Sequence, residues 1–309
     1  MKKITAIIIG GLMSLMASAQ QRPINSLYMF DPLVVNPAYT GTQVQLSATA
    51  IYRNQWVNFP GAPKTFTFSA SSGFKQNRVG VGILAGSDQI GIHTENTLYL
   101  LYSYKLPFSK FNSKSYLSFG LQGGFNELKS DFGKLNPRDE ADPYYGVVDR
   151  NMTWNFGGGL FLKHNSFYAG LSVPYIMNNK VINAEVFSSS ARQYRYYYLT
   201  AGITRKLSTN VKVIPSTLIR FQEKAPLSFD LNLITVFYNV VGLGVSYRLD
   251  DSVVGLFELQ LNENFHVGYA NDFTMSDLRR YSNSSHEIMI NYRIRIDKWH
   301  RGIECPSYY

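Results

Sequence analysis

Alternation between apolar and polar positions is the dominant pattern of this chain, and it is longest near the carboxy terminus. In residues 285–297, SHEIMINYRIRID, one set of alternate positions runs through Ile288, Ile290 and Tyr292, whereas the other set includes Glu287 and Arg293. A period of two over this length predicts a β-strand with one apolar and one polar face. An apolar face toward lipid and a charged face toward a lumen is typical of an outer-membrane barrel. We interpret this stretch as the last strand of a barrel, which pairs with the first.

Alternating segments of the same kind occur along most of the chain, and most are about 9–13 residues long, as a tilted membrane strand requires. They are 43–53, 64–74, 78–86, 94–106, 115–127, 152–162, 167–173, 194–206, 211–220, 227–236, 240–249, 253–261, 265–273 and 285–297. The segment 211–220 is the weakest, because Pro215 lies inside it and lacks the N–H that a ladder uses. The sequence therefore predicts an all-β fold, a transmembrane antiparallel β-barrel of about 14 strands.

The connections between these segments differ in length in a regular way. Every second one is short and turn-like, as at His164-Asn165 and Tyr238-Asn239, whereas the intervening ones include the long stretches 128–151, 174–193 and 274–284. Bacterial barrels have short turns in the periplasm and long loops outside the cell. We therefore expect short periplasmic turns and long extracellular loops, with both chain ends in the periplasm.

The amino-terminal end has the features of a secretory signal peptide. Lys2 and Lys3 precede an apolar run that ends at Met16, and Ala17-Ser18-Ala19 is a small-residue cleavage site. We expect a signal peptide at 1–19, an N-terminal periplasmic or plug-like segment at 20–42, the β-barrel at 43–297 and a periplasmic C-terminal tail at 298–309. Export by a cleavable signal peptide places the barrel in the outer membrane.

Composition agrees with a barrel and argues against a nucleic-acid partner. The 309 residues include 22 Tyr and 20 Phe, and Tyr is suited to the interfacial girdles of membrane proteins. The formal net charge of +9 is compatible with nucleic-acid binding, but an exported chain does not meet nucleic acid. The single Cys305 excludes an internal disulfide framework.

Short motifs near both ends of the chain resemble one family. N-P-A-Y-x-G at 36–41 is followed by R-x-Q-W at 53–56 and A-P-x-T at 62–65, and S-H-E-I-M-x-x-Y lies at 285–292. These motifs, in this order and spacing, resemble the PorP/SprF family of the Bacteroidetes type IX secretion system. The family-motif residues are Asn36, Pro37, Ala38, Tyr39, Gly41, His286 and Glu287.

The resemblance implies a function as well as a fold. It implies an outer-membrane component of the type IX secretion system that docks or anchors a secreted partner at the cell surface. Such a partner is adhesin-like and bears a C-terminal secretion domain, and in some members the assembly supports gliding motility. Other secretion components would be further partners. The alternative function is a passive porin or a FadL-like channel for small solutes.

Several residues are candidates for binding. Arg53, Gln55 and Trp56 lie at the first outward loop and are partner-contact candidates, since Trp and Arg are favoured interface anchors; the alternative for Trp56 is a place in the aromatic girdle. The 36–41 motif forms either the turn that leads into the first strand or a periplasmic contact or partial lumen plug. Packing or loop pairing is expected of His286 and Glu287.

Alternation also places charges in the lumen, and the strongest candidates are Asp230, Glu258, Arg293 and Arg295. They would either form a satisfied polar network or bind a plug or partner segment, because inward charges must pair or stay hydrated.

Enzyme chemistry has little support in the sequence. The five His residues show no metal-ligand spacing such as H-E-x-x-H, and no phosphate-binding or dinucleotide motif is present. The acidic loop 129–150 lacks the D-x-[DN]-x-[DN]-G pattern of a calcium loop. We expect no enzyme activity, no cofactor and no metal site.

Overall fold

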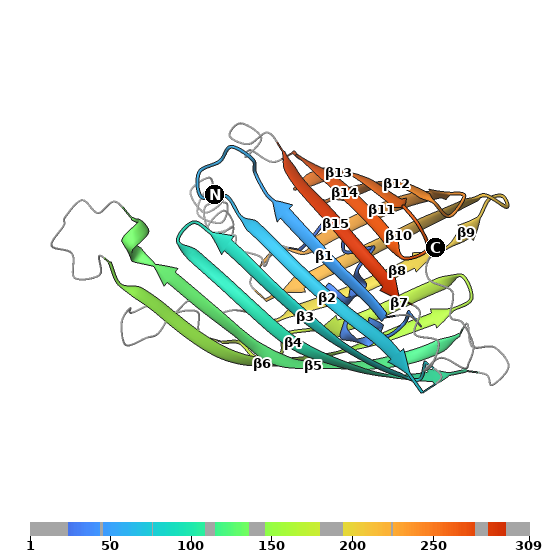
Figure 1. Ribbon diagram of the computed structural model, residues 1–309, viewed down its shortest axis with the longest axis horizontal. Helices are drawn as coiled ribbons and strands as arrows, with labels where there is room; N and C mark the ends of the chain where they lie inside the picture. The colour runs from blue at the N-terminus through green and yellow to red at the C-terminus, as the bar shows by residue number, and fades with distance from the viewer. Residues whose placement is uncertain are drawn as a thin grey trace, which may run out of the picture.

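The computed structural model describes residues 24–43, 46–75, 77–108, 115–135, 146–179, 194–223, 225–275 and 284–294. These ranges are mostly antiparallel β-sheet wound into one barrel of tilted strands (Figure 1). The expected signal peptide, the tail 298–309 and Arg295 lie outside the described residues. Within the described ranges, no helix has both the length and the apolar character needed to cross a membrane.

The strands follow the segments predicted from alternation. They are β1 (Leu46–Asn54), β2 (Lys64–Phe74), β3 (Val79–Ile90), β4 (His93–Pro107), β5 (Tyr116–Asp131), β6 (Val148–His164), β7 (Phe167–Val173), β8 (Tyr196–Ile203), β9 (Arg205–Lys206), β10 (Val211–Gln222), β11 (Ser228–Phe237), β12 (Val241–Arg248), β13 (Ser252–Gln260), β14 (Phe265–Thr274) and β15 (Ser285–Ile294). Short 3-10 turns are η1 (Pro32–Val34), η2 (Pro37–Tyr39) and η3 (Phe132–Lys134).

Two pairings close the sheet into a barrel. β10 pairs with β11, and β15 pairs with β1 over a register that runs from Leu46 opposite Ile294 to Asn54 opposite His286. β8 and β9 are two parts of one strand, because both pair with β10 in the same register. The result is a closed barrel of 14 antiparallel strands, so the predicted fold class and the pairing of the last strand with the first are confirmed.

The segment around Pro215 forms a strand despite the missing N–H. On one side Pro215 lies opposite Leu233 in the ladder with β11. On the other side the described pairs with β8 stop at Ser216 opposite Gly202, and those with β9 resume at Val213 opposite Arg205. Proline therefore occupies the point where this ladder is interrupted, which is where a strand tolerates it.

The two ends of the barrel differ. At one end, here called the turn side, the connections are short, such as 165–166 and 238–240; the other end, the loop side, carries the long connections 132–147, 174–195 and 275–284. β5 and β6 are 16 and 17 residues long, and their hairpin projects beyond the loop-side rim (Figure 1). Both strands exceed their predicted lengths because the ladder continues through polar pairs such as Lys129 opposite Arg150, where apolar alternation ends.

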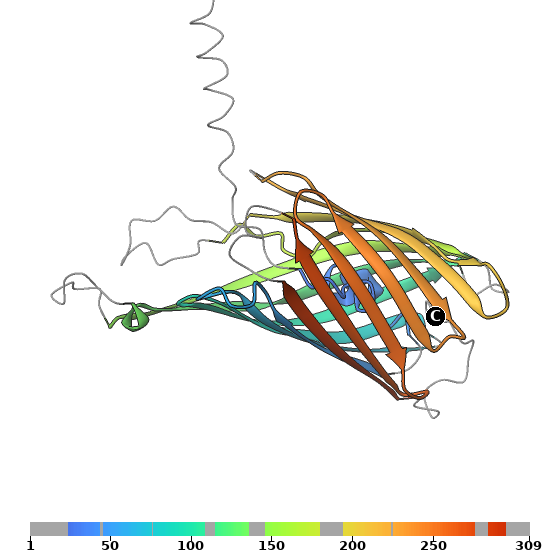
Figure 2. The same ribbon diagram turned by 90° about the horizontal axis from the view of Figure 1, so that it is seen from above.

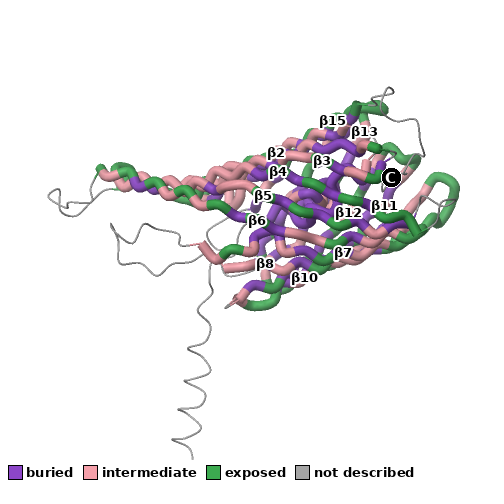
Figure 3. Tube along the Cα trace, turned by 90° about the horizontal axis from the view of Figure 1, so that it is seen from below, coloured by how far each residue is buried: buried purple, intermediate pink, exposed green. Residues whose placement is uncertain are grey.

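The two faces of the wall follow the predicted alternation. In β15, Ile288 and Ile290 are 56% and 50% exposed, whereas Glu287 and Met289, which alternate with them, are fully buried. Buried and exposed positions alternate in the same way along most of the wall, and buried residues also fill the centre of the barrel (Figure 3). The exposed face is rich in Leu, Val, Phe and Tyr, as a lipid-facing surface is.

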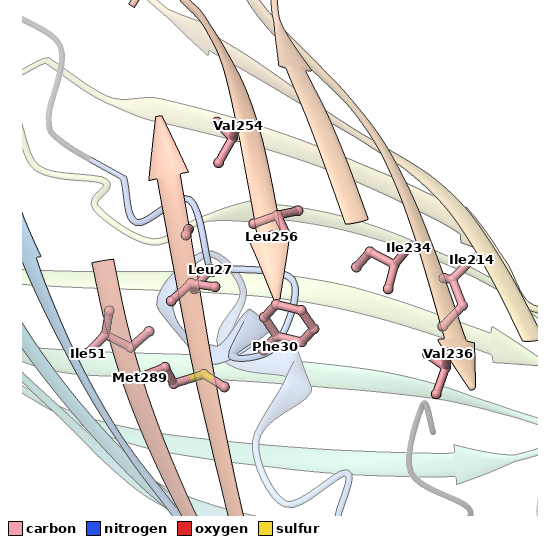
Figure 4. Close-up of a cluster of buried hydrophobic side chains, with 10 residues drawn as sticks. Leu27, Phe30, Ile51, Ile214, Ile234, Val236, Val254, Leu256 and Met289 are labelled. Carbon is pink, nitrogen blue, oxygen red and sulfur yellow. The ribbon is translucent and has the colours of Figure 1, made fainter. Parts of the chain in front are cut away.

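The interior of the barrel contains residues 24–43, here called the lumen segment (Figure 2). Leu27 and Phe30 pack against inward-pointing side chains of the wall (Figure 4), which are Ile51, Ile214, Ile234, Val236, Val254, Leu256, Ala270 and Met289. The inner face of the wall therefore carries apolar side chains as well as the predicted polar and charged ones. These inward apolar residues cover the apolar side chains of the lumen segment. Burial of each large side chain contributes about 1.5–3 kcal/mol to the stability of the folded barrel.

Candidate functional site

Three charged residues at the loop side form a buried cluster, here called the loop-side cluster: Arg53 of β1, Asp272 of β14 and Glu287 of β15. Arg53 Nη1 lies 2.8 Å from Glu287 Oε1, and Arg53 Nη2 lies 2.9 Å from Asp272 Oδ2. All three side chains are almost completely buried. Alternation positions them, because each occupies an inward position of its strand, and the β1–β15 register sets Arg53 directly opposite Glu287.

The loop-side cluster binds the beginning of the lumen segment mainly through its backbone. The carboxylate of Glu287 accepts hydrogen bonds from the backbone N–H groups of Ser26 and Leu27, at 2.7 and 3.0 Å. Arg53 donates to the carbonyl of Ile24, and the Ser26 hydroxyl donates to Asp272 Oδ2 at 2.8 Å. Hydrogen bonds to ionised groups are stronger than neutral ones. The cluster therefore holds an extended chain at the loop-side end of the lumen.

The charges continue along the inner wall beyond this cluster. Arg248 Nη1 of β12 lies 3.9 Å from Asp272, and Arg248 Nε lies 3.3 Å from Asp230 of β11. Arg220 of β10 lies 3.7 Å from the same Asp230. Positive and negative groups thus alternate around this part of the wall, which offsets the high cost of removing each charge from water.

The family motif at 36–41 lies deeper in the barrel, against β3 to β6. Asn36 caps η2, because its Oδ1 accepts the Ala38 N–H at 2.9 Å, and its Nδ2 donates to the carbonyl of Leu160 at 2.9 Å. The Tyr39 ring contacts Phe161 edge to face, with 5.5 Å between ring centroids. The structure thus places the motif inside the lumen, as part of the lumen segment.

Glycines in the wall provide the space for this motif. A Cβ on Gly120 of β5 would lie 2.1 Å from the backbone nitrogen of Ala38, and a Cβ on Gly159 of β6 would lie 2.2 Å from Asn36 Oδ1. Gly41 has a φ of +61°, which favours glycine, and it lies against the backbone of Gly80. The wall therefore has glycine at positions where even one added methyl group would collide with the lumen segment.

Gly120→Ala is expected to destabilise the folded barrel by about 1–3 kcal/mol, the usual cost of overpacking, because η2 must move to admit the new Cβ. Gly123→Ala is the matched control in the same strand, since a Cβ on Gly123 meets nothing within 4 Å. The measurement is the unfolding midpoint of each purified barrel, followed by its gel mobility. Equal midpoints for the two variants would contradict the close fit of the lumen segment.

Arg53 is placed differently from the expectation. It was expected at the first outward loop as a partner contact, but it lies inside the barrel, because it continues the inward series of Ser47, Thr49 and Ile51. Gln55 and Trp56 do lie in the connection after β1. The backbone N–H of Trp56 donates to Ser285 Oγ at 3.1 Å, and Trp56 adopts a φ of +47°. The structure therefore separates Arg53 from the two loop residues.

The other predicted residues divide between the two faces of the wall. Asp230, Glu258 and Arg293 are buried inside, where Glu258 Oε1 lies 3.7 Å from His266 Nδ1 and Arg293 Nε lies 2.7 Å from Asn291 Oδ1. His286 points to the opposite face from Glu287. Its Nδ1 lies 2.7 Å from the Tyr269 hydroxyl, and its Nε2 lies 3.0 Å from Ser284 Oγ.

Sequence reasoning missed several residues of this site. Asp272, Arg248 and Arg220 each occupy an inward position of a predicted strand or its end, so alternation was the signal that could have found them. Asp31 of the lumen segment is buried and accepts a hydrogen bond from Ser69 at 2.6 Å, and no sequence pattern pointed to it. Among the described residues, no group of three or more His, Cys, Asp or Glu is placed to hold a metal ion.

Comparison with known families gives one match that covers most of the chain. Residues 17–292 match the family described as type IX secretion system membrane protein PorP/SprF. The chain belongs to the PorP/SprF family. This PorP/SprF protein is accordingly an outer-membrane component of the type IX secretion system. The long loops of bacterial barrels face the cell exterior, and the loop side is assigned to the exterior by this rule. The family and fold are those of a membrane secretion component.

Solved structures similar to this PorP/SprF chain are outer-membrane barrels. Omp33 of Acinetobacter baumannii is 8% identical, with a TM-score of 0.50 over 82% of this chain and 100% of that one. The CymD monoaromatic hydrocarbon channel is 13% identical (TM-score 0.49, 88% and 94% covered), and the toluene transporter TodX of Pseudomonas putida is 10% identical (0.46, 89% and 95%). At this identity, the likeness to Omp33 shows the barrel fold alone. Comparison with curated proteins found no match.

Proposed function

We propose that this PorP/SprF protein docks a secreted partner on its extracellular loops and anchors it at the cell surface by contact alone, without a covalent step. The observation that supports this most is the occupied interior. The lumen segment is bound at the loop-side cluster and again at β3 to β6. A barrel filled by its own chain offers a large partner its loops rather than an open channel.

The partner that fits this proposal is a secreted surface protein, adhesin-like and carrying the C-terminal domain by which type IX substrates are exported. Other components of the secretion system would contact the same barrel from the periplasmic turns. Anchoring of an adhesive protein would serve gliding motility, since a moving cell must transmit force to a surface through a fixed attachment. No nucleic acid has a place in this arrangement.

Trp56 and Gln55 are the proposed contact residues on the first extracellular loop. Trp56 is half-buried at the barrel rim, close to Ser285 at the start of β15, and Phe59 in the same loop is 40% exposed. Partly exposed aromatic side chains held by a rigid rim are typical interface anchors, because little conformational entropy is lost when they are covered.

Trp56→Ala is expected to weaken binding of the secreted partner by about 2 kcal/mol or more, the size typical of an interface hot spot, which is about thirtyfold in affinity. Tyr238→Ala is the matched control, because Tyr238 is also an aromatic residue with a positive φ, +53°, but lies in a periplasmic turn. The measurement is the amount of partner that copurifies with each variant and remains on the cell surface. Equal loss in both variants would contradict the assignment of Trp56.

A passive small-solute channel is the competing function, and the same purified protein distinguishes the two. Docking predicts a stable one-to-one complex with a large secreted protein and little solute flux into liposomes that contain the barrel. A channel predicts rapid flux of small solutes with no such complex. Flux in the full-length barrel without any complex would overturn the proposed function.

A further inference from the structure

The direction in which the lumen segment crosses the barrel is fixed by contacts at its two ends. At the loop side, Ile24, Ser26 and Leu27 bind Arg53 and Glu287. Arg53 is the penultimate residue of β1, and Glu287 is the third residue of β15. Both positions are at the extracellular ends of their strands. The earliest described residues of the chain are therefore at the extracellular mouth.

The other end of the segment lies at the turn side. The Ser103 hydroxyl of β4 donates to the carbonyl of Thr40 at 2.7 Å, and Lys105 of the same strand donates to the carbonyl of Gly41. Gly41 also lies against Gly80, the second residue of β3. These positions are close to the periplasmic turns. The segment then leads into β1, which begins at Leu46 on this side.

Contacts between the two ends follow the same order. Asp31 accepts a hydrogen bond from Ser69 in the middle of β2. Further along the segment, Asn36 donates one to the carbonyl of Leu160, which lies four residues before the turn-side end of β6. The chain thus runs from the extracellular mouth down to the periplasmic side and then turns back up as β1. An entry from the periplasm would need the opposite order of contacts.

We infer that the lumen segment begins, at Ile24, at the extracellular mouth of the barrel and not in the periplasm. The expectation that both chain ends face the periplasm follows from an even number of strands alone, and it ignores a segment that crosses the lumen before the first strand. The beginning of the lumen segment then lies on the same side of the barrel as the extracellular loops. This inference rests on the fold and does not depend on the proposed docking function.

The end is held firmly at this position. The bonds to the loop-side cluster are buried and made to charged groups. Releasing them would leave Arg53 and Glu287 without their backbone partners and Asp272 without the Ser26 hydroxyl. Leu27 adds apolar packing against Ile51 and Met289 of the two strands that close the barrel. The lumen segment thus contacts both β1 and β15, the two strands whose pairing closes the barrel.

Cysteine labelling on intact cells tests the inference. In a Cys305→Ser background, Pro23→Cys places a thiol just before the first described residue, Phe59→Cys places one on an extracellular loop, and Glu263→Cys places one in a periplasmic turn. A maleimide that cannot cross the outer membrane is added before or after permeabilisation. Heat-dependent gel mobility verifies that each variant is folded.

The expected result is that Pro23→Cys, like Phe59→Cys, is labelled on intact cells, whereas Glu263→Cys is labelled only after permeabilisation. Labelling of Pro23→Cys only after permeabilisation would overturn the inference, and so would a lack of labelling in both conditions while the variant is folded.

A cleavable epitope inserted between Pro23 and Ile24, removed by protease added to intact cells, provides a second measurement if the cysteine variant does not fold. Persistence of that epitope until the cells are permeabilised would also overturn the inference. Neither readout involves the secreted partner, so failure here leaves the docking proposal to be judged by its own experiment.

Discussion

Arg53→Ala is expected to destabilise the barrel by about 3–5 kcal/mol, the cost of breaking a buried ion pair by removing one partner. The substitution leaves the carboxylates of Asp272 and Glu287 buried without the guanidinium that lies 2.9 and 2.8 Å from them. It also removes the donor to the carbonyl of Ile24. Loss of the loop-side cluster should release the beginning of the lumen segment and loosen the closure between β1 and β15.

The measurement is the unfolding free energy of the purified barrel in denaturant, with protease sensitivity of the lumen segment as a second readout. Arg150→Ala is the control, because Arg150 lies 3.9 Å from Glu127 in an exposed pair, and such pairs contribute about 0–1 kcal/mol. Arg53→Met combined with Glu287→Gln should be less damaging than Arg53→Met alone, since the double variant removes both charges of the Arg53–Glu287 pair. Similar losses in the double and single variants would exclude an ionic role for Arg53.

The wall of the barrel could be predicted from the sequence because each strand carries its own signal. Alternation depends only on which side of a strand is covered by lipid, so the faces of β15 are readable without any knowledge of its neighbours. The same rule applies to Arg53, which shares its face with Thr49 and Ile51. Grouping Arg53 with the nearby Gln55 and Trp56 as one loop motif led to the expectation that it lies in the outward loop, whereas it lies inside the barrel.

The charge pairs inside the barrel depend on information that no single strand contains. Arg248 lies opposite Asp230 because a short turn fixes the register between β11 and β12, and this pair was within reach of sequence reasoning. Arg53 lies opposite Glu287 only because the barrel closes in one particular register, and two strands at opposite ends of the chain must meet for that. The hydrophobic pattern excludes a slip by one residue, which would turn the apolar face inward, but it does not choose between registers that differ by two residues.

The path of the lumen segment was the least predictable feature. Residues 24–43 contain several Pro and Asn residues and no period of two or of 3.6, so their pattern indicates turns but no location. Their place inside the barrel depends on shape: Gly80, Gly120 and Gly159 leave room for the backbone of the segment. Glycine in a strand was compatible with several explanations, and only the packed structure identifies close backbone approach as the reason.

Ile290→Arg is expected to impair insertion of the barrel, because an arginine near mid-depth on the lipid face costs about 2–4 kcal/mol. Ile290 is half-exposed on the outer face of β15, between Ala50 of β1 and Val267 of β14. The charge would therefore meet hydrocarbon with apolar neighbours on both sides. The measurement is the fraction of folded protein in the outer membrane, followed by gel mobility before and after heating.

Arg293→Ala is the comparison within the same strand, and a milder effect is expected. Arg293 is buried on the inner face, where its Nε lies 2.7 Å from Asn291 Oδ1. Its removal affects hydrogen bonds inside the barrel but leaves the lipid-facing surface unchanged. If Ile290→Arg inserted normally while Arg293→Ala did not, the inner and outer faces of β15 would be reversed. The loop-side cluster would then face lipid, and neither the position of the lumen segment inside the barrel nor the extracellular position of its first residue, Ile24, would follow.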